Sequence, residues 1–449
     1  MQLANYYRKL LERMPKLAVD ADQVQVLHSA RAFKQRLLEL ISRAQTRIYL
    51  VSLYLQDDQA GREILTALYE AKQANPALDI RLFVDFHRAQ RGLIGHQGQG
   101  GNHLMYQEFA ARYPQQIAIH GVPVKGREIL GVLHLKGFIF DDTLLYSGAS
   151  LNDIYLHQQD RYRFDRYHQI THPQLAQTMV NYVRELFIDN PAVPPLTRAD
   201  IPRARQLRNE IRLFKQALRR TQYQFRDTPR NPGQVCITPL AGLGKRGNRL
   251  NRTIRTLVRG TRQRLFVCTP YFNLPKPLAR DIRNLLKKGI EVTLVLGDKT
   301  ANDFYIAPEE SFRTIGGLPY LYESNLRRFA RANQTFIYQG HLNIMLWRHE
   351  RNSYHLKGLF VDDDLAMITG NNLNPRAWGL DLENGLLVQD PELLLKPRFE
   401  AERENILAHC QRIEHFSEIE ELDDYPQAVQ KLLKRVQRTR ANVLLKRLL

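Results

Sequence analysis

The feature that most constrains the fold of this chain is a motif that occurs twice. The pattern His-x-Lys-x4-Asp spans residues 134–141 and returns at residues 355–362, and both copies share the string His-Leu-Lys-Gly. A short motif found once carries a false-positive risk, but two matched copies in similar surroundings indicate an internal duplication. We therefore expect two similar halves that assemble one active site between them.

Each half also contains a predicted strand, a helix and a second strand ahead of its motif. These segments are residues 47–54, 62–72 and 80–84 in the first half, and 264–271, 278–288 and 290–296 in the second. Apolar residues recur at helical spacing in the middle segments, and β-branched and aromatic residues fill the flanking runs. A unit of this length implies a parallel strand pair with a right-handed crossover, so the predicted fold class is α/β.

The motifs themselves lie in predicted strands, residues 132–140 and 354–361, each followed by an Asp-rich turn and a returning strand. Side chains at positions i and i+2 of a strand point to the same face of the sheet. The histidine and the lysine of each motif should therefore project together, while the leucine between them packs into the core.

These residue types suit the chemistry of phosphate esters. Imidazole is both a nucleophile and an acid–base group near neutral pH, so His134 and His355 could divide these two roles. Lys136 and Lys357 would neutralise the non-bridging phosphate oxygens as negative charge builds up in the transition state.

Matching residues also follow each motif. Gly148 and Gly370 would let the backbone approach a phosphate closely, and Asn152 and Asn374 could add amide donors.

Composition narrows the setting of this site. The 449 residues include three widely spaced cysteines, which form no metal pattern and no disulfide framework, so a reducing cytoplasm is the simplest compartment. No apolar run is long enough for a membrane span, and the N-terminus does not read as a secretory signal. The net charge of +19 favours polyanionic partners, either nucleic acid, the ribosome or an anionic membrane surface.

We divide the chain into residues 1–195, 196–425 and 426–449, which are a first half, a basic connecting segment with the second half, and a basic amphipathic end. Such an end is typical of a helix that binds a membrane surface or nucleic acid. The alternative is a helix packed on the core with a solvated basic face. The candidate membrane contacts are Arg203, Arg212, Arg219, Lys431, Lys434, Arg435 and Arg438.

The duplicated motif, followed each time by glycine and asparagine, resembles the signature of the phospholipase D superfamily over nearly the whole chain. The resemblance implies two similar α/β/α halves with mixed sheets and one active site at their interface. It also implies that the motif histidines and lysines and the downstream asparagines form one phosphate site without a metal or other cofactor. Asp141 and Asp362 would be structural.

In that superfamily a downstream carboxylate orients each histidine. Glu383 fits one of these two roles, and Asp165 is its candidate counterpart, with Asp160 as the competing choice. The spacing from glycine to asparagine is one residue longer than the common Gly-Ser-x-Asn pattern. Ser150 and Asn372, which take the intermediate position, are therefore assigned to substrate binding together with the two glycines.

Within the superfamily the chain most resembles the bacterial phosphatidylserine synthases, through residues 134–142 and 370–378, its length and its basic charge. This resemblance implies transfer of a phosphatidyl group from CDP-diacylglycerol to L-serine through a phosphatidyl-histidine, on the inner face of the cell membrane. We favour His134 as the nucleophile and His355 as the acid–base, although the reverse order is chemically equivalent.

Several alternatives stay open. A cardiolipin synthase or a phospholipase D hydrolase would use the same site, and a nucleic-acid phosphodiesterase would use the same basic charge. A binding module without activity, for a membrane or a ribosome, is disfavoured because both motifs are intact. The oligomeric state is open, because two halves in one chain need no second copy.

Overall fold

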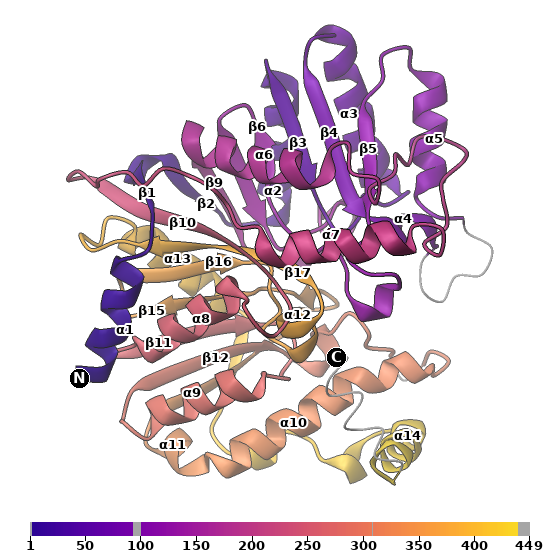
Figure 1. The fold of residues 1–449 in the computed structure, drawn as a ribbon. Coiled ribbons are helices and arrows are strands. Elements are labelled where there is room, and N and C mark those ends of the chain that lie inside the picture. The colour runs from indigo at the N-terminus through magenta and orange to yellow at the C-terminus, as the bar shows by residue number, and fades with distance from the viewer. Residues whose placement is uncertain (1, 93–99, 308, 439–449) are drawn as a thin grey trace.

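The computed structural model describes residues 2–92, 100–307 and 309–438, and its two halves are each built on a mixed β-sheet (Figure 1). The first sheet has seven strands in the order β2 (Val24–Leu27), β9 (Tyr167–Thr171), β7 (Thr143–Ser147), β6 (Phe138–Phe140), β3 (Arg47–Val51), β4 (Asp79–Asp85) and β5 (Ala118–Val122). The second has nine, in the order β1 (Leu17–Asp20), β10 (Gln234–Leu243), β17 (Leu382–Gln389), β16 (Leu365–Thr369), β15 (Gly358–Val361), β11 (Arg264–Thr269), β12 (Glu291–Gly297), β13 (Leu342–Trp347) and β18 (Cys410–Ile413). A small ladder of β8 (Arg163–Phe164) and β14 (Ser353–Tyr354) joins the halves.

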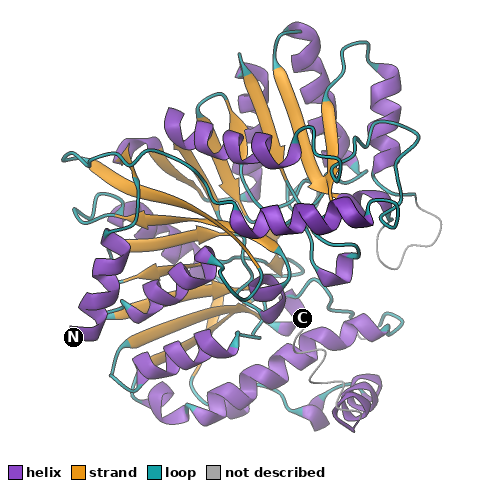
Figure 2. Cartoon of the chain, viewed as in Figure 1, coloured by secondary structure: helices purple, strands orange, loops and turns teal. Residues whose placement is uncertain are grey.

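Helices cover the faces of both sheets (Figure 2). Those of the first half are α2 (Ala30–Arg43), α3 (Gln59–Ala74), α4 (Phe86–Gln90), α5 (His103–Arg112) and α6 (Pro173–Phe187). The connecting α7 (Arg208–Arg220) runs along the junction of the halves, where it contacts α6 and β10. The remaining helices are α1 (Gln2–Glu12), α8 (Arg249–Arg259), α9 (Lys276–Leu286), α10 (Leu318–Ala332), α11 (Gln334–Tyr338), α12 (Pro375–Gly379), α13 (Lys396–Leu407) and α14 (Gln427–Arg438).

Both predicted strand–helix–strand units are confirmed. Strand β3 pairs in parallel with β4 across α3, and β11 pairs in parallel with β12 across α9. The apolar stripe of each helix is buried against its sheet, which is why the periodicity could be read from the sequence. The α/β prediction with two similar halves therefore holds.

The predicted motif strands are wrong in extent, because each is broken at the glycine of its His-Leu-Lys-Gly string. Gly137 has φ 124° and Gly358 has φ 135°, values that a residue with a Cβ rarely adopts. At or after the glycine, β6 and β15 pair within their own sheets. The histidine and the lysine lie before the bend, on backbone that pairs with the opposite half, as in the bridge between Leu133 and Leu382. The bend is what lets one short motif take part in two ladders.

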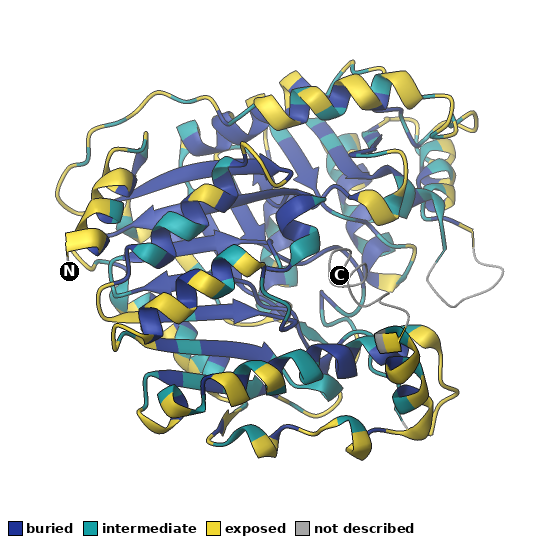
Figure 3. Cartoon of the chain, turned by 60° about the horizontal axis from the view of Figure 1, so that its bottom comes forward, coloured by how far each residue is buried: buried dark blue, intermediate teal, exposed yellow. Residues whose placement is uncertain are grey.

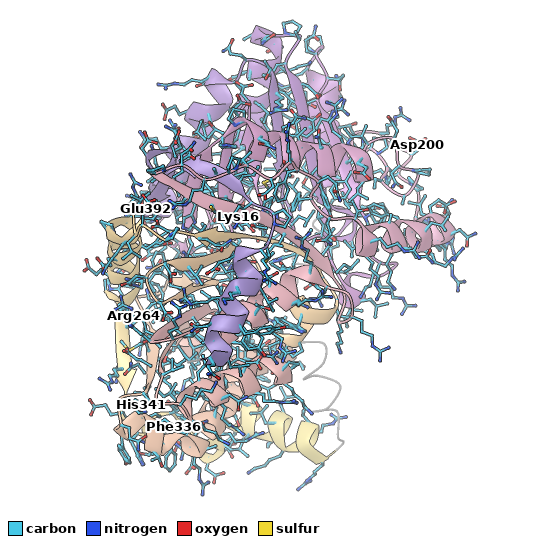
Figure 4. The ribbon with its side chains drawn as sticks, turned by 60° about the vertical axis from the view of Figure 1, so that its left-hand side comes forward. Lys16, Asp200, Arg264, Phe336, His341 and Glu392 are labelled. Atoms are coloured by element: carbon cyan, nitrogen blue, oxygen red, sulfur yellow. The ribbon has the colours of Figure 1, made fainter. Side chains whose placement is uncertain are left out.

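The N-terminal segment departs from the division of the chain at residue 195. Strand β1 pairs antiparallel with β10 of the second sheet, and α1 packs against α8. Figure 4 shows α1 in front of the second sheet, with Lys16 at the connection to β1. Arg8 of α1 donates hydrogen bonds to Asp362 and Asp364, so an ion pair adds to this docking.

One hydrophobic core spans the junction between the halves. It combines residues of the first sheet such as Phe83 with residues of the second such as Val235 and Leu386, under α6, α7 and α13. Further clusters lie under α2 and α3 and under α8 and α9, so the strands are buried between helices with exposed outer faces (Figure 3).

The basic C-terminal segment is described up to residue 438, and its remainder, 439–449, lies outside the described residues. Val429 and Leu433 of α14 are buried against Tyr320 and Tyr425, while Lys431 and the other basic positions face outward. Of the two predicted alternatives, this arrangement matches the helix that packs on the core and leaves its basic face in solvent. No helix in the described part of the chain is both long and apolar enough to cross a membrane.

Candidate active site

Each motif pairs with a strand of the opposite half. The backbone N–H of His134 donates to the carbonyl of Leu382 at 2.9 Å, beside a parallel bridge between Leu133 and Leu382. The N–H of His355 donates to the carbonyl of Phe164 at 2.8 Å, at the end of the ladder between β8 and β14. This reciprocal pairing brings the two motifs, which are far apart in the sequence, into one site.

The same exchange supplies each histidine with a carboxylate. His134 Nδ1 lies 2.9 Å from Glu383 Oε2, and His355 Nδ1 lies 3.1 Å from Asp165 Oδ2. Both carboxylates are buried, whereas the competing Asp160 is exposed. A carboxylate on Nδ1 fixes the tautomer that leaves Nε2 to react.

The two motif lysines are buried beside these pairs. Lys357 Nζ donates to Asp165 Oδ2 at 3.0 Å and also contacts His355 Nδ1. Lys136 Nζ donates to the carbonyl of Ala149 at 3.4 Å. Burial, together with the charge of Lys357, lowers the pKa of Lys136 to about 7. The positive charge of Lys357 thus disfavours the protonated form of Lys136, and an anionic ligand beside the two lysines would offset this repulsion.

The histidine–carboxylate pairs differ in their electrostatics. Burial and the neighbouring lysines lower the pKa of His134 well below 6.5, and burial raises the pKa of Glu383. At the other pair, burial and Lys357 lower the pKa of His355 to about 4. Burial alone would raise the pKa of Asp165, but Lys357 and His355 outweigh it, so the pKa is lowered.

The glycines after the motifs make room for these side chains. A Cβ on Gly148 would lie 2.8 Å from the carboxylate of Asp165 and 3.0 Å from Lys357 Nζ. A Cβ on Gly370 would lie 2.7 Å from Cγ of Lys136. Each predicted substrate-binding glycine therefore lies against the motif lysines or the carboxylate of Asp165, where a larger residue would displace them.

The downstream polar residues are buried at the same place. Asn152 Oδ1 accepts from the N–H of Tyr155 at 3.0 Å, and Asn374 Oδ1 accepts from the N–H of Ala377 at 2.9 Å. Both carbonyl ends thus cap local turns, and the amide group of Asn152 also donates to Gln56 Oε1 at 3.4 Å, so a ligand would meet the remaining amide N–H groups. Ser150 is buried nearby, and the Oδ1 atom of Asn372 accepts no hydrogen bond from a described residue.

Asp141 and Asp362 have matching contacts in the two halves. The carboxylate of Asp141 accepts from the backbone N–H groups of residues 45, 46 and 47, and that of Asp362 accepts from residues 262, 263 and 264. Both aspartates have a positive φ, near 50°. They tie the turn after each motif to the start of the neighbouring strand.

Two residues that the sequence analysis did not single out hold the motif lysines. Asn384 accepts from the N–H of Lys136 and donates to its carbonyl, both at 2.8 Å. Arg166 donates to Glu402 on α13 at 2.7 Å, and its Nη1 lies 3.5 Å from the carbonyl of Lys357. Asn384 directly follows Glu383, and Arg166 directly follows Asp165. This matching position in the two halves is the sequence signal by which they could have been found.

Comparison with known proteins agrees with this architecture. A family model described as "Cardiolipin synthase, PLD-like domain" matches the chain twice, over residues 37–186 and 254–404. The chain is 46% identical over 443 residues to the CDP-diacylglycerol–serine O-phosphatidyltransferase of Haemophilus influenzae, covering 98% of this chain and 97% of that protein. The Escherichia coli protein of the same name is 46% identical over 446 residues, covering 99% and 98%.

A solved structure is equally similar. The crystal structure of phosphatidylserine synthase from Haemophilus influenzae matches with a TM-score of 0.96 over 99% of both chains, at 46% identity. The repeated match covers both halves, and the relatives extend over nearly their full lengths. The chain therefore belongs to the phospholipase D-like family and, within it, to the bacterial CDP-diacylglycerol–serine O-phosphatidyltransferases.

Proposed function

We propose that this protein makes phosphatidylserine and CMP from CDP-diacylglycerol and L-serine, through a covalent phosphatidyl-histidine. The observation that carries the proposal is the pair of buried histidines, each held at Nδ1 by a carboxylate from the opposite half, with two buried lysines between them. His355 lowers the pKa of His134, so the two imidazoles lie near each other and could act on one phosphate group, one as nucleophile and the other as acid–base.

In the first step His134 Nε2 attacks the phosphorus that carries diacylglycerol, and the bond from this phosphorus to the bridging oxygen of CMP breaks. His355 donates its proton to that oxygen, so CMP leaves. Lys136 and Lys357 offset the charge on the non-bridging oxygens, and the amides of Asn152 and Asn374 add donors.

In the second step the serine hydroxyl takes the place that CMP has left. His355 accepts the hydroxyl proton, the serine oxygen bonds to phosphorus, and the bond to His134 Nε2 breaks. The free enzyme returns with both histidines in their starting protonation states, and phosphatidylserine is released.

Burial lowers the pKa of both histidines, and the difference between the two pairs lies in their carboxylates. A nucleophilic imidazole must be neutral, and the strongly lowered pKa of His134 satisfies this requirement. A general acid must be protonated, and the ionised Asp165 next to His355 stabilises an imidazolium there. A bound phosphodiester would raise the pKa of His355 from about 4, because it adds negative charge beside the ring.

We also propose that the protein attaches reversibly to the anionic inner face of the cell membrane, where its lipid substrate lies. The exposed basic residues Arg212 and Arg219 of α7 support this, because α7 runs along the junction of the halves at which the site lies. Burial and then Lys215 lower the pKa of Lys125 to about 8, with Arg219 and Arg376 adding to the effect, and Arg376 also lowers the pKa of His134, so Arg376 connects the cations of α7 to the site.

The deciding experiment is CMP release from CDP-diacylglycerol in mixed micelles, with and without L-serine, for the purified protein beside His134→Ala and His355→Ala. We expect serine-dependent release over many turnovers with phosphatidylserine formed, and neither repeated turnover nor phosphatidylserine in the two variants. Equal release with water or glycerol would favour a hydrolase or a cardiolipin-type enzyme. No release would rule out CDP-diacylglycerol as substrate and bring forward a nucleic-acid phosphodiesterase.

A further inference from the structure

Beside His355 lies an ion pair that the two transfer steps do not use. Arg163 Nε is 2.8 Å from Asp303 Oδ1, and the two side chains are 14% and 12% exposed. The pair is thus sheltered but reachable from solvent. Arg163 comes from the short β8 strand, whereas Asp303 follows β12, so the pair forms only when the halves come together.

Aromatic residues fix this pair against the histidine. The guanidinium of Arg163 lies 4.5 Å from the ring centre of Tyr155, whose hydroxyl is 2.9 Å from His355 Nδ1 and 3.3 Å from its Nε2. Tyr271 donates to Asp303 Oδ2 at 3.0 Å, and its ring centre is 6.4 Å from that of His355. The charges of Arg163 and Asp303 are therefore held at a defined place next to the reacting imidazole.

The pair has hydrogen-bonding capacity left over. Arg163 Nε also donates to Ser353 Oγ at 3.3 Å, but neither Nη atom donates to another side chain or carbonyl among the described residues. Ser353 also hydrogen-bonds the carboxylate of Asp303, whose buried Oδ1 lies 2.8 Å from Arg163 Nε without a directed hydrogen bond from a described residue. A guanidinium fork is suited to a carboxylate, and a carboxylate oxygen is suited to an ammonium group.

We propose that Arg163 and Asp303 bind the acceptor as an amino-acid zwitterion, with Arg163 on its carboxylate and Asp303 on its ammonium group. The inference rests on the proposed transfer to serine and names the residues that select this acceptor. Serine carries its hydroxyl on the carbon next to the one that bears both charged groups. Anchoring both charges at this pair places the hydroxyl toward His355, the group that accepts its proton.

The side of the site near His134 has a different charge pattern. Arg376 pairs there with Asp381 at 3.2 Å, and Lys125 adds a further cation. An excess of positive charge suits a phosphate but repels an ammonium group. The balanced pair beside His355 is thus the better place for a zwitterion, and this asymmetry supports His355 as the acid–base.

The test compares the purified full-length protein with Asp303→Asn and Arg163→Gln in detergent micelles of CDP-diacylglycerol. Two quantities are measured, the KM for L-serine and the exchange of labelled CMP into CDP-diacylglycerol, which needs no acceptor. Asp281→Asn is the matched control, because Asp281 is a buried carboxylate paired with Arg255 and Arg259 on the outer helices. We expect both variants to raise the KM for serine about tenfold or more and to lower the rate of exchange by a clearly smaller factor, whereas the control changes neither.

An acceptor panel separates binding from a structural effect. Ethanolamine lacks the carboxylate and 3-hydroxypropanoate lacks the ammonium group. Asp303→Asn should lower the ratio of the transfer rate to serine over that to 3-hydroxypropanoate, and Asp303→Glu should restore part of this ratio. Arg163→Gln should lower the ratio of the transfer rate to serine over that to ethanolamine.

The outcomes are distinct. An unchanged KM for serine and an unchanged acceptor preference in both variants would overturn the acceptor site. An equal loss of exchange and transfer at constant KM for serine would also overturn the acceptor site, because the pair would then act only by positioning His355. A wild-type protein without CMP exchange and without phosphatidylserine would instead overturn the proposed function.

Discussion

Asp165 of the first half holds His355 of the second, with Oδ2 3.1 Å from Nδ1, while the same oxygen accepts from Lys357 at 3.0 Å. Glu383 of the second half holds His134 of the first in return. Neither half therefore contains a complete histidine–carboxylate pair. The site depends on the contact between the halves, and a monomer provides that contact.

Removing the charge of Asp165 should reduce kcat more than removing the charge of Glu383. The pKa of Asp165 is lowered by Lys357 and His355 against the effect of burial, so it carries a full charge, whereas burial raises the pKa of Glu383. We expect Asp165→Asn to reduce kcat roughly 10²–10⁴-fold and Glu383→Gln only about tenfold. Initial rates of CMP exchange measure both. Equal losses in the two variants would contradict this assignment.

The assignment of the histidines can be tested by trapping the intermediate. In His355→Ala the nucleophile His134 remains, so the enzyme should form the phosphatidyl adduct slowly and fail to pass it to serine. Lipid-labelled CDP-diacylglycerol, followed by denaturation and intact-mass analysis, should show the adduct in His355→Ala and none in His134→Ala. The reverse pattern would exchange the two roles.

The pH dependence should reflect Lys136, whose pKa is lowered to about 7 by burial and by Lys357. A lysine holds phosphate only when protonated, so its contribution is present below pH 7 and is lost as the pH rises through that value. We expect kcat/KM for CDP-diacylglycerol to fall above about pH 7, while kcat falls at a higher pH because bound phosphate stabilises the charge. Lys136→Arg should move the falling limb of kcat/KM upward. A kcat/KM that stays constant from about pH 6.5 to 8.5 would exclude this role.

The elements that sequence could predict are those set by local patterns. The helices α3 and α9 bury one face, and this burial imposes a period that is visible in the sequence. The motif residues were found because they are duplicated. Local patterns carry no information about pairing partners, so the ladder of β8 with β14 and the docking of α1 on the second half could not be predicted.

The choice between carboxylates shows the same limit. Asp165 was the favoured counterpart of Glu383 and Asp160 the competing choice, and spacing alone did not decide between them. The assembled structure separates them, since Asp160 is exposed and Asp165 meets a histidine 190 residues away in the sequence. Arg163 and Asp303 carried no signal at all, because their relation exists only across the junction.

The bend in the second motif should be intolerant of a side chain. Gly358 has φ 135°, and a Cβ there would lie 2.2 Å from Arg166 Nη1 and 2.7 Å from the carbonyl of Met367. Gly233 is the matched control, with φ 82° and nothing within 4 Å of its Cβ position. We expect Gly233→Ala to lose about 1–2 kcal/mol of unfolding free energy and Gly358→Ala clearly more, because overlap adds to backbone strain. Urea unfolding followed by tryptophan fluorescence would show the order of the two midpoints, and equal midpoints would contradict it.

Membrane attachment through α7 makes a prediction about charge placement. Arg212 and Arg219 are exposed on this helix, whereas Ile211 and Phe214 are buried, so the helix offers basic groups to a surface without giving up its packing. Each basic residue near an anionic bilayer contributes about 1 kcal/mol, so reversing both charges should weaken binding to phosphatidylglycerol vesicles about 30-fold or more at moderate salt. Arg280→Glu with Arg283→Glu on α9 gives the same change in net charge on an outer face of the second half. Vesicle sedimentation should show the larger loss for the α7 variant, because its two charges lie in the surface that we propose contacts the bilayer. An equal loss in both would mean that net charge alone, and not the surface around α7, governs attachment.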